Sequence, residues 1–307
     1  MRFIRLFGSR RLVLAGTGTF LGLALAACSS TTPSTAGAGS ASSVPGSASP
    51  AAMAGMPGMS GMDEPMYTGD GLAATSSGFT LAPVSDTTSV ASGQAVSLTF
   101  RITDSAGKAL TSYQDDQTKL MHFYAVRSDL SGFQHVHPTM AADGTWTAKL
   151  AAMAPGTYRM YTSFITNNSS GTATALVLSK QFTVAGMATA VTLPAASSTT
   201  QVDGYTVTLS GELMAGMEHT LKATVTKDGA PVTYLEPYLD TYAHLTAFHA
   251  GDLAFAHLHP QGAVNGDHGG PTLTFDAQMA KSGDYRLFLQ FQTGGVLHTA
   301  AITVHVR

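Results

Sequence analysis

Short runs in which apolar and polar residues alternate fill most of the chain after residue 78. Residues 95–102 and 158–164 have the period of two that is typical of half-buried β-strands, and turn sequences such as Asp143-Gly144 separate the runs. We count about seven runs between residues 79 and 185 and about seven more between 202 and 307. The pattern predicts strands here and no helix of useful length.

One stretch of the sequence occurs twice. Three histidines and a proline recur at a constant spacing of 122 residues, in two matching sets: His122, His135, His137 and Pro138, then His244, His257, His259 and Pro260. Each copy is about 105 residues long, the size of one β-sandwich. The sequence therefore predicts an all-β protein with two tandem Ig-like or cupredoxin-like β-sandwich domains, at 79–186 and 202–307, joined by a linker at 187–201.

Residues 1–27 have the pattern of a signal peptide, with four arginines and then an apolar run too short for a good membrane span. Leu25-Ala26-Ala27-Cys28 resembles a bacterial lipobox, which implies cleavage before Cys28 and a lipid on its thiol. An uncleaved segment with a free thiol and an ordinary secretory signal are the alternatives. Ser9-Arg10-Arg11 also resembles a twin-arginine export signal. In every case the folded part is exported, and we expect a lipid anchor in the membrane with the domains on its outer face.

Residues 28–78 are rich in Ser, Thr, Ala, Gly and Pro, and we expect a disordered tether because so few apolar residues cannot offset the chain entropy. Removing the leader takes away four of the 16 Lys and Arg and none of the 19 Asp and Glu, so the mature charge is 12 − 19 = −7. Nucleic acid is therefore not expected as a partner. Lipidation of Cys28, the single cysteine, would exclude disulfides and a blue-copper ligand set. No motif of an enzyme is present, and we predict none.

Each histidine triplet is predicted to lie on one β-hairpin. In the second copy Gly251-Asp252 suits a two-residue loop, which places His244 opposite His259 with the third histidine on the same face. The same register in the first copy makes Asp129-Leu130 the loop. Opposed Cβ atoms lie about 5 Å apart and diagonal ones about 7 Å, so three imidazoles can close around one ion. A three-residue loop would separate the triplet.

The triplets also have simpler interpretations, either as a solvated strand face or as buried histidines with hydrogen-bonding partners. Two triplets in register favour a shared purpose, although copies also inherit structural histidines. The opposite faces are apolar enough to be the core sides: Phe123, Ala125, Val136, Leu245, Ala247 and Leu258. That leaves the histidine faces free, and we predict two independent metal sites, one in each domain.

The second chemical feature is a row of five methionines at spacings of three or four residues: Met53, Met56, Met59, Met62 and Met66. Thioethers select Cu(I) and similar soft ions, and core packing cannot be their purpose in a flexible tether. Low-complexity drift is the alternative. The tract resembles the Met-rich segments of bacterial copper-resistance proteins.

Further residues are possible secondary ligands. Met214, Met217 and His219 form a smaller Met/His group in the second copy, where Met214 could equally pack and His219 lie at the surface. His268, His298 and Met140 are more often incidental at such positions.

The phrases Leu235-Glu-Pro-Tyr-Leu, His257-Leu-His259-Pro260 and Gly283-Asp-Tyr-Arg-Leu-Phe-Leu-Gln-Phe resemble exported bacterial β-sandwich proteins similar in style to the YtkA-like group. The resemblance covers both copies and implies a β-sandwich fold, export and an association with copper.

These features predict a lipid-anchored envelope protein that binds copper, or else zinc, as a chaperone or buffer. A copper-accepting envelope protein would be its partner. The alternative is a metal-free Ig-like interaction module of the cell envelope.

Overall fold

The computed structural model describes residues 67, 69–85 and 90–307, and the side chain of His257 is outside this description. The predicted signal peptide, Cys28 and the five methionines of the predicted tether therefore lie outside the described residues. The described part consists of 18 strands and connecting turns, without a helix. Within that part, no helix has the length and apolar character needed to cross a membrane.

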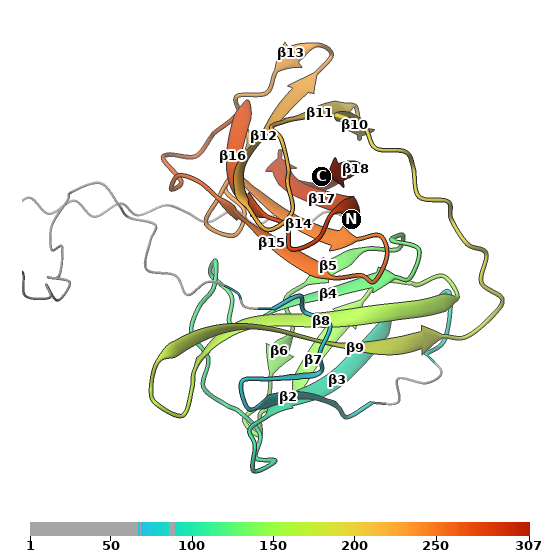
Figure 1. Cartoon of the computed structure of the whole chain (residues 1–307), viewed down its shortest axis with the longest axis vertical. Coiled ribbons are helices and arrows are strands. Elements are labelled where there is room, and N and C mark those ends of the chain that lie inside the picture. Colours follow the sequence, from blue (N-terminus) through green and yellow to red (C-terminus); the bar gives the residue numbers. More distant parts are fainter. Residues whose placement is uncertain (1–66, 68, 86–89) are drawn as a thin grey trace, which may run out of the picture. The chain divides into compact units, whose positions relative to one another are not determined.

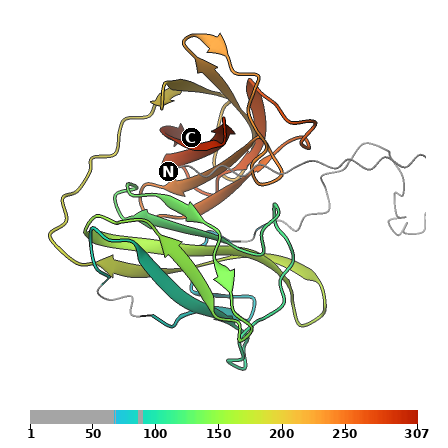
Figure 2. The same cartoon turned by 180° about the vertical axis from the view of Figure 1, so that it is seen from behind.

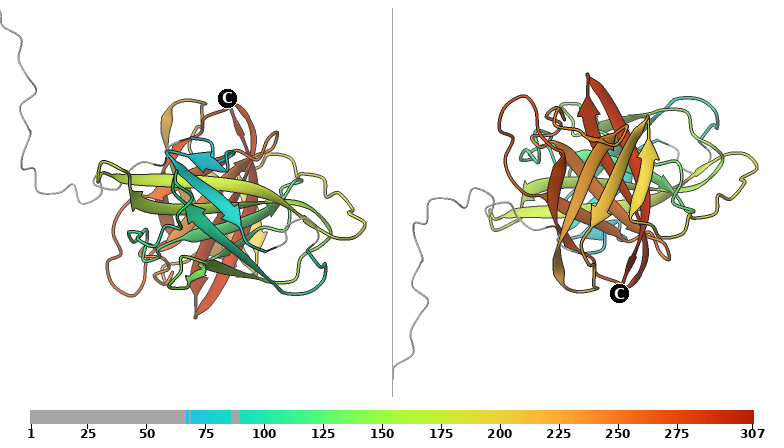
Figure 3. Two further views of the ribbon diagram at one scale, coloured as in Figure 1. Left: turned by 90° about the horizontal axis from the view of Figure 1, so that it is seen from below. Right: turned by 90° about the horizontal axis from the view of Figure 1, so that it is seen from above.

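Nine strands form the first sandwich, which is coloured blue to yellow-green in Figure 1. They are β1 (Thr75–Ser76), β2 (Phe79–Pro83), β3 (Val96–Thr103), β4 (His122–Arg127), β5 (Gln134–Val136), β6 (Thr139–Met140), β7 (Trp146–Leu150), β8 (Gly156–Asn167) and β9 (Ala173–Val184). One sheet has the order β1-β2-β3-β7-β6, and the facing sheet has the order β5-β4-β8-β9. In the view from below, the teal strands of one sheet cross over the yellow-green strands of the other (Figure 3).

The second sandwich, yellow to red, repeats this arrangement (Figure 2). Its strands are β10 (Thr199–Val202), β11 (Tyr205–Ser210), β12 (Glu218–Lys227), β13 (Ala230–Pro231), β14 (Ala243–His249), β15 (Phe255–Pro260), β16 (Thr272–Gln278), β17 (Gly283–Thr293) and β18 (Val296–Val306). Their order is β10-β11-β12-β16-β15-β14-β17-β18, with β13 beside β12. The prediction of two tandem all-β sandwiches is confirmed.

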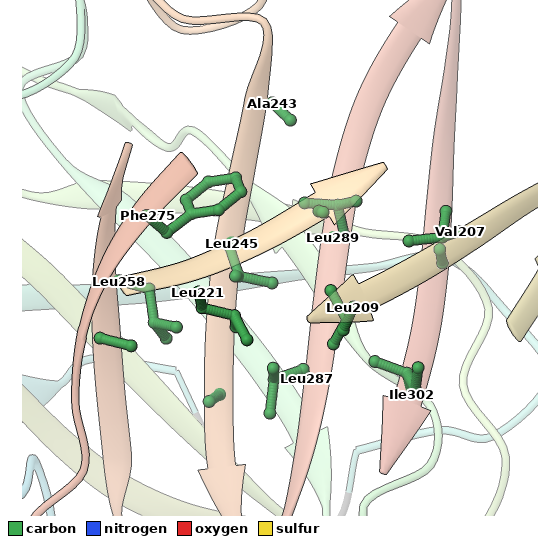
Figure 4. Packing of buried hydrophobic residues seen from close by; sticks show 14 of the residues in the cluster. Val207, Leu209, Leu221, Ala243, Leu245, Leu258, Phe275, Leu287, Leu289 and Ile302 are labelled. Atoms are coloured by element: carbon green, nitrogen blue, oxygen red, sulfur yellow. The ribbon is translucent and has the colours of Figure 1, made fainter. Parts of the chain in front are cut away.

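The core of each sandwich is built from one face of each alternating strand. In the second sandwich Leu221, Leu245, Leu258 and Leu289 come from four different strands and point into the same layer (Figure 4). In the first, Trp146 lies in the equivalent layer with other aromatic side chains and is 2% exposed. The faces predicted to be core sides of the two hairpins do pack against these cores.

The ends of the domains differ slightly from the prediction. Strand β1 begins at Thr75, inside the segment assigned to the tether, and β10 begins at Thr199, inside the segment assigned to the linker. Each is the first strand of a hairpin, β1 pairing with β2 and β10 with β11. This pairing makes each folded domain begin a few residues before the predicted boundary. The linker is also held to the first sandwich, because the main-chain N–H of Val191 donates to Asp129 at 2.8 Å.

Candidate metal centre

The first triplet comes from the hairpin of β4 and β5. Phe123 pairs with Val136 and Tyr124 pairs with His135, so one further step brings His137 opposite His122. The second hairpin has the same register, with Leu245 paired with Leu258. The registers that the sequence predicted are therefore confirmed.

The turns themselves differ from the prediction. In the second hairpin the ladder ends where His249 donates to Ala254, which leaves four loop residues and not two. The register survives because each added loop residue on one strand is matched by one on the other. In the first hairpin Arg127 donates to Ser131 across a three-residue loop, in which Leu130 adopts a positive φ of 64°. This loop does not separate the triplet, as had been expected, because one extra residue on the β5 side restores the register before Gln134. The predicted two-residue loops are wrong, although their consequence for the histidines holds.

The His-x-His-Pro segment lies where the chain passes from one sheet to the other. In the second sandwich β15 pairs with β14 through Leu258 and with β16 from His259 onward. In the first sandwich the same passage is split into β5 and β6, with Pro138 between them. Because proline has no N–H to donate to a ladder, it suits this crossing. The last histidine of each triplet therefore sits at the corner between the sheets.

The first triplet is a compact cluster. Each of His122, His135 and His137 offers one ligand nitrogen, and these three atoms lie within 4.8 Å of one another. The ring centroids are separated by 4.8 to 5.2 Å. It is the single group of three such ligands found among the described residues. Bonds of about 2.0–2.1 Å to a tetrahedral ion put ligand atoms roughly 3.3 Å apart, so only a small inward movement is needed.

The hydrogen bonds at the outer edge of the cluster define its tautomers. His122 Nε2 donates to the main-chain oxygen of Asp116 at 3.0 Å, and His135 Nδ1 lies 2.6 Å from Oε1 of Gln290. Both oxygens can only accept, so both of these nitrogens carry hydrogen. The inner nitrogens, His122 Nδ1 and His135 Nε2, are then 3.0 Å apart with their lone pairs facing each other. A cation placed between these two nitrogens, either a proton or a metal ion, would satisfy both lone pairs.

His137 completes this arrangement. Its Nε2 is buried and has no hydrogen-bond partner among the described residues. Burial lowers the pKa of His137 to about 3, assisted by repulsion from His122 and Lys119. Burial also lowers the pKa of His122, which the nearby Asp116 opposes in part. Both imidazoles are therefore neutral at pH 7, the form that binds metal.

The second sandwich contributes to the same cluster. The ring of His244 lies parallel to that of His122, with centroids 5.5 Å apart, and 4.8 Å from that of His135. Tyr124 donates its hydroxyl hydrogen to His244 Nε2 at 3.1 Å, and His244 Nδ1 donates to Gln117 at 2.8 Å. Both nitrogens of His244 are thus engaged across the two sandwiches. The triplets meet here, whereas the sequence predicted two independent sites.

The other members of the second triplet are placed separately. His259 pairs with Asp276 on β16, and its ring stacks on Tyr67 at 6.3 Å. Burial lowers the pKa of His259. His257 lies on β15, and because its side chain is outside the description, a metal site at the second triplet stays a prediction.

Among the described residues, no secondary candidate joins the first triplet. His298 lies between Asp203 and Thr293 in the second sandwich, with hydrogen bonds of 2.8 and 3.0 Å, which is a structural role. Met217 is 52% exposed, and Met140 packs against the first core. Met214 is half-buried, and His268 is exposed in a loop. His219 has a buried ring nitrogen.

Sequence reasoning missed the residues that surround the triplet. Asp116 is 1% exposed and comes from the loop before β4, and Tyr67 donates a short hydrogen bond to its carboxylate. Gln290 is 3% exposed on β17. It is a polar residue within the apolar run Leu-Phe-Leu-Gln-Phe, and a buried amide in such a run was the available signal.

A family model described as Domain of unknown function (DUF8832) matches residues 75–181 and 200–307. The chain belongs to the DUF8832 family. The two matched segments coincide with the two sandwiches, so the domain is present twice and the duplication is confirmed. A comparison with curated proteins found no match.

Several solved structures are similar to this DUF8832 chain at low identity. InvD of Yersinia pseudotuberculosis is 15% identical over 76% of this chain and 58% of that chain, with a TM-score of 0.25. Escherichia coli alpha-2-macroglobulin activated by porcine elastase is 12% identical over 74% of this chain and 20% of that chain, with a TM-score of 0.26. A putative membrane anchored protein from Corynebacterium diphtheriae is 10% identical over 75% of this chain and 58% of that chain, with a TM-score of 0.21. The chain spans less than two thirds of the length of each of these.

Proposed function

We propose that this chain is an envelope metal-binding protein in which His122, His135 and His137 hold a transition-metal ion. The observation that carries this proposal is the facing pair of inner nitrogens, 3.0 Å apart, whose outer N–H groups are both bound to oxygen acceptors. Metal-binding histidines almost always donate their second N–H in this way, because that bond fixes the ring and its tautomer. The buried Nε2 of His137 supplies a third ligand.

The ligand set favours copper, with zinc as the second candidate. Imidazole nitrogens suit copper and zinc, whereas magnesium and calcium prefer oxygen ligands. The methionine tract at residues 53–66 supports copper, since thioethers bind Cu(I). A protein with this site and without an enzyme motif would act as a copper chaperone or buffer, passing its ion to an accepting envelope protein.

Metal retention tests the proposal. The mature protein should take up Cu(II) or Zn(II) and melt at a higher temperature with either ion, because a ligand at a thousandfold excess over its dissociation constant adds about 4 kcal/mol of stability. The rival function is a metal-free interaction module of the cell envelope. Absence of both uptake and thermal gain would favour that rival.

Metal uptake should persist into mildly acidic solution. An ordinary histidine protonates at about pH 6.5, and protons compete with metal for the imidazole nitrogen. Since the pKa values of His122 and His137 are both lowered by burial, the midpoint for loss of Cu(II) should lie clearly below pH 6.5. Competition titrations at a series of pH values measure this midpoint. A midpoint at or above pH 6.5 would contradict the lowered pKa values of the two histidines.

The methionine tract is proposed as a separate Cu(I) site. A peptide covering residues 50–68 should bind Cu(I) or Ag(I), because its thioethers can wrap around one ion. The matched control replaces all five methionines with leucine, which keeps size and hydrophobicity. Equal binding by the two peptides, measured by competition with a chromogenic chelator, would remove the tract from the mechanism.

Membrane anchoring through Cys28 is likewise a proposal, supported by the lipobox-like sequence at residues 25–28. Cys28→Ala should shift the protein out of the detergent phase in Triton X-114 partitioning, since the lipid would no longer be attached. If mutant and parent partition alike, Cys28 carries no anchor.

A further inference from the structure

Two described side chains of the second sandwich, Gln290 and His244, lie against the first triplet. Gln290 on β17 accepts a hydrogen bond from His135 Nδ1 at 2.6 Å, and this bond leaves Nε2 of the same ring as its inner nitrogen. His244, the ladder partner of Gln290, covers the His122 and His135 rings from the side of the second sandwich. The orientation of His135 as a ligand is thus set by a residue 155 positions away in sequence.

An apolar cluster holds the second sandwich in this position. It joins Tyr124, Val126, Leu130, Tyr161 and Val177 of the first sandwich to Phe248, Leu253, Phe255 and Phe288 of the second. Phe133 stacks on Phe288 with ring centroids 4.0 Å apart and planes 6° from parallel. Tyr161 also donates to the main-chain oxygen of Leu253 at 2.5 Å. Side chains packed in this way fix the distance between Gln290 and the triplet.

We infer that the metal centre is completed by the second sandwich, so that metal binding and docking of the two sandwiches are one coupled equilibrium. This inference rests on the proposed metal function. Gln290 is a positioning residue: it fixes the His135 ring only while the sandwiches are docked. Docking raises the affinity of the triplet for the ion by some factor. By thermodynamic reciprocity, a bound ion must raise the equilibrium constant for docking by the same factor. Separating the sandwiches therefore lowers the affinity of the triplet for the ion and provides a route for its release.

The test compares three variants of the complete mature chain with Cu(II) as the probe. Gln290→Leu removes the acceptor, and Gln290→Glu keeps an acceptor of the same length. Gln292→Leu is the control, since Gln292 lies on the same strand but bonds to Glu236 and not to the triplet. Loss of a partner that orients a ligand typically costs 10- to 100-fold in metal affinity. We expect that loss for Gln290→Leu, and affinities within a few fold of the parent for the other two.

Hydrogen exchange provides the second measurement. Cu(II) should slow amide exchange in β14 and in the loop at Leu253 of the parent, although neither belongs to the hairpin of the first triplet. The slowing should be much smaller in Gln290→Leu and retained in Gln290→Glu, which a purely structural role for Gln290 would not produce. Parent-like affinity of Gln290→Leu, or no slowing in the parent's second sandwich, would overturn the coupling while the metal site stands. A parent that binds no Cu(II) would overturn the metal function and the coupling together.

Discussion

Replacing His137 with alanine should abolish metal binding at the first triplet and leave the fold intact. The variant loses one of three ligands, and two imidazoles do not hold an ion as firmly. Little stability should be lost, because the buried Nε2 of His137 has no hydrogen-bond partner among the described residues. Its removal therefore leaves no buried polar group unsatisfied. We expect the loss of one equivalent of Cu(II) and of its thermal gain, measured by metal analysis and thermal melting.

His305→Ala is the control for this experiment. Its side chain is 60% exposed on β18 and bonds to Asp284 at 2.7 Å, so its removal should change neither metal uptake nor melting. His259→Ala tests the second triplet and should remove a further equivalent if that triplet binds an ion of its own. Loss of both equivalents in either variant would mean one shared site, which the contact of His244 with the first triplet makes geometrically accessible. Parent-like binding by His137→Ala would make the histidines structural.

Asp129→Ala should destabilise the protein by about 3 kcal/mol, since it leaves the buried guanidinium of Arg127 without its charge partner. Asp129 and Arg127 are 2.6 Å apart, with side chains only 17% and 7% exposed. The carboxylate also accepts from Ser131 and from the Val191 N–H. Because Asp129 and Ser131 lie in the turn between β4 and β5, the variant should weaken metal uptake as well. Urea unfolding at pH 7 measures the loss.

The same carboxylate predicts an acid dependence. Burial alone would raise the pKa of Asp129, but the hydrogen bonds from Arg127 and Ser131 outweigh it and hold the pKa well below its ordinary value of 3.8. A depressed folded-state pKa gives stability that is present above the unfolded value and is lost as the pH falls through the folded one. The contribution of Asp129 should therefore be complete at neutral pH and decline only in strong acid.

Asp143→Ala is a matched control, because Arg101 and Asp143 are also 2.6 Å apart but lie 40% and 58% exposed. Solvent screens this pair, so its loss should cost much less stability than the loss of Asp129. An equally small loss in both variants would show that burial does not strengthen the Arg127 pair.

The hairpins show how far local sequence can predict a site. Phe123 and Val136 must both face the core, and this requirement sets the pairing of β4 with β5 whatever the form of the turn. The histidines then share the opposite face because side chains alternate along a strand. The register was predicted from a two-residue loop at Gly251-Asp252, and it holds because the four loop residues of the second hairpin are centred on that pair. In the first hairpin the loop has three residues, and one extra residue on the β5 side restores the predicted register.

The surroundings of the triplet could not be predicted in the same way. Strands β4 and β14 are buried on both faces, so their outer sides carry Tyr124 and Phe248, side chains that pack against the other sandwich. Alternation within one strand does not say which distant surface covers such a face. Gln290 reaches His135 only through this docking, which no spacing of residues in the chain encodes.

The sequence by itself determined the two all-β domains, the core side of each strand and the common face of His122, His135 and His137, because these follow from interactions between near neighbours and from duplication. Only the tertiary structure decided that the first triplet is oriented by Asp116 and Gln290 and that His244 lies against it. The physical reason is that hydrogen bonds to buried imidazoles depend on side-chain positions to within a fraction of an ångström. Such positions are set by the packing of aromatic residues far apart in the chain.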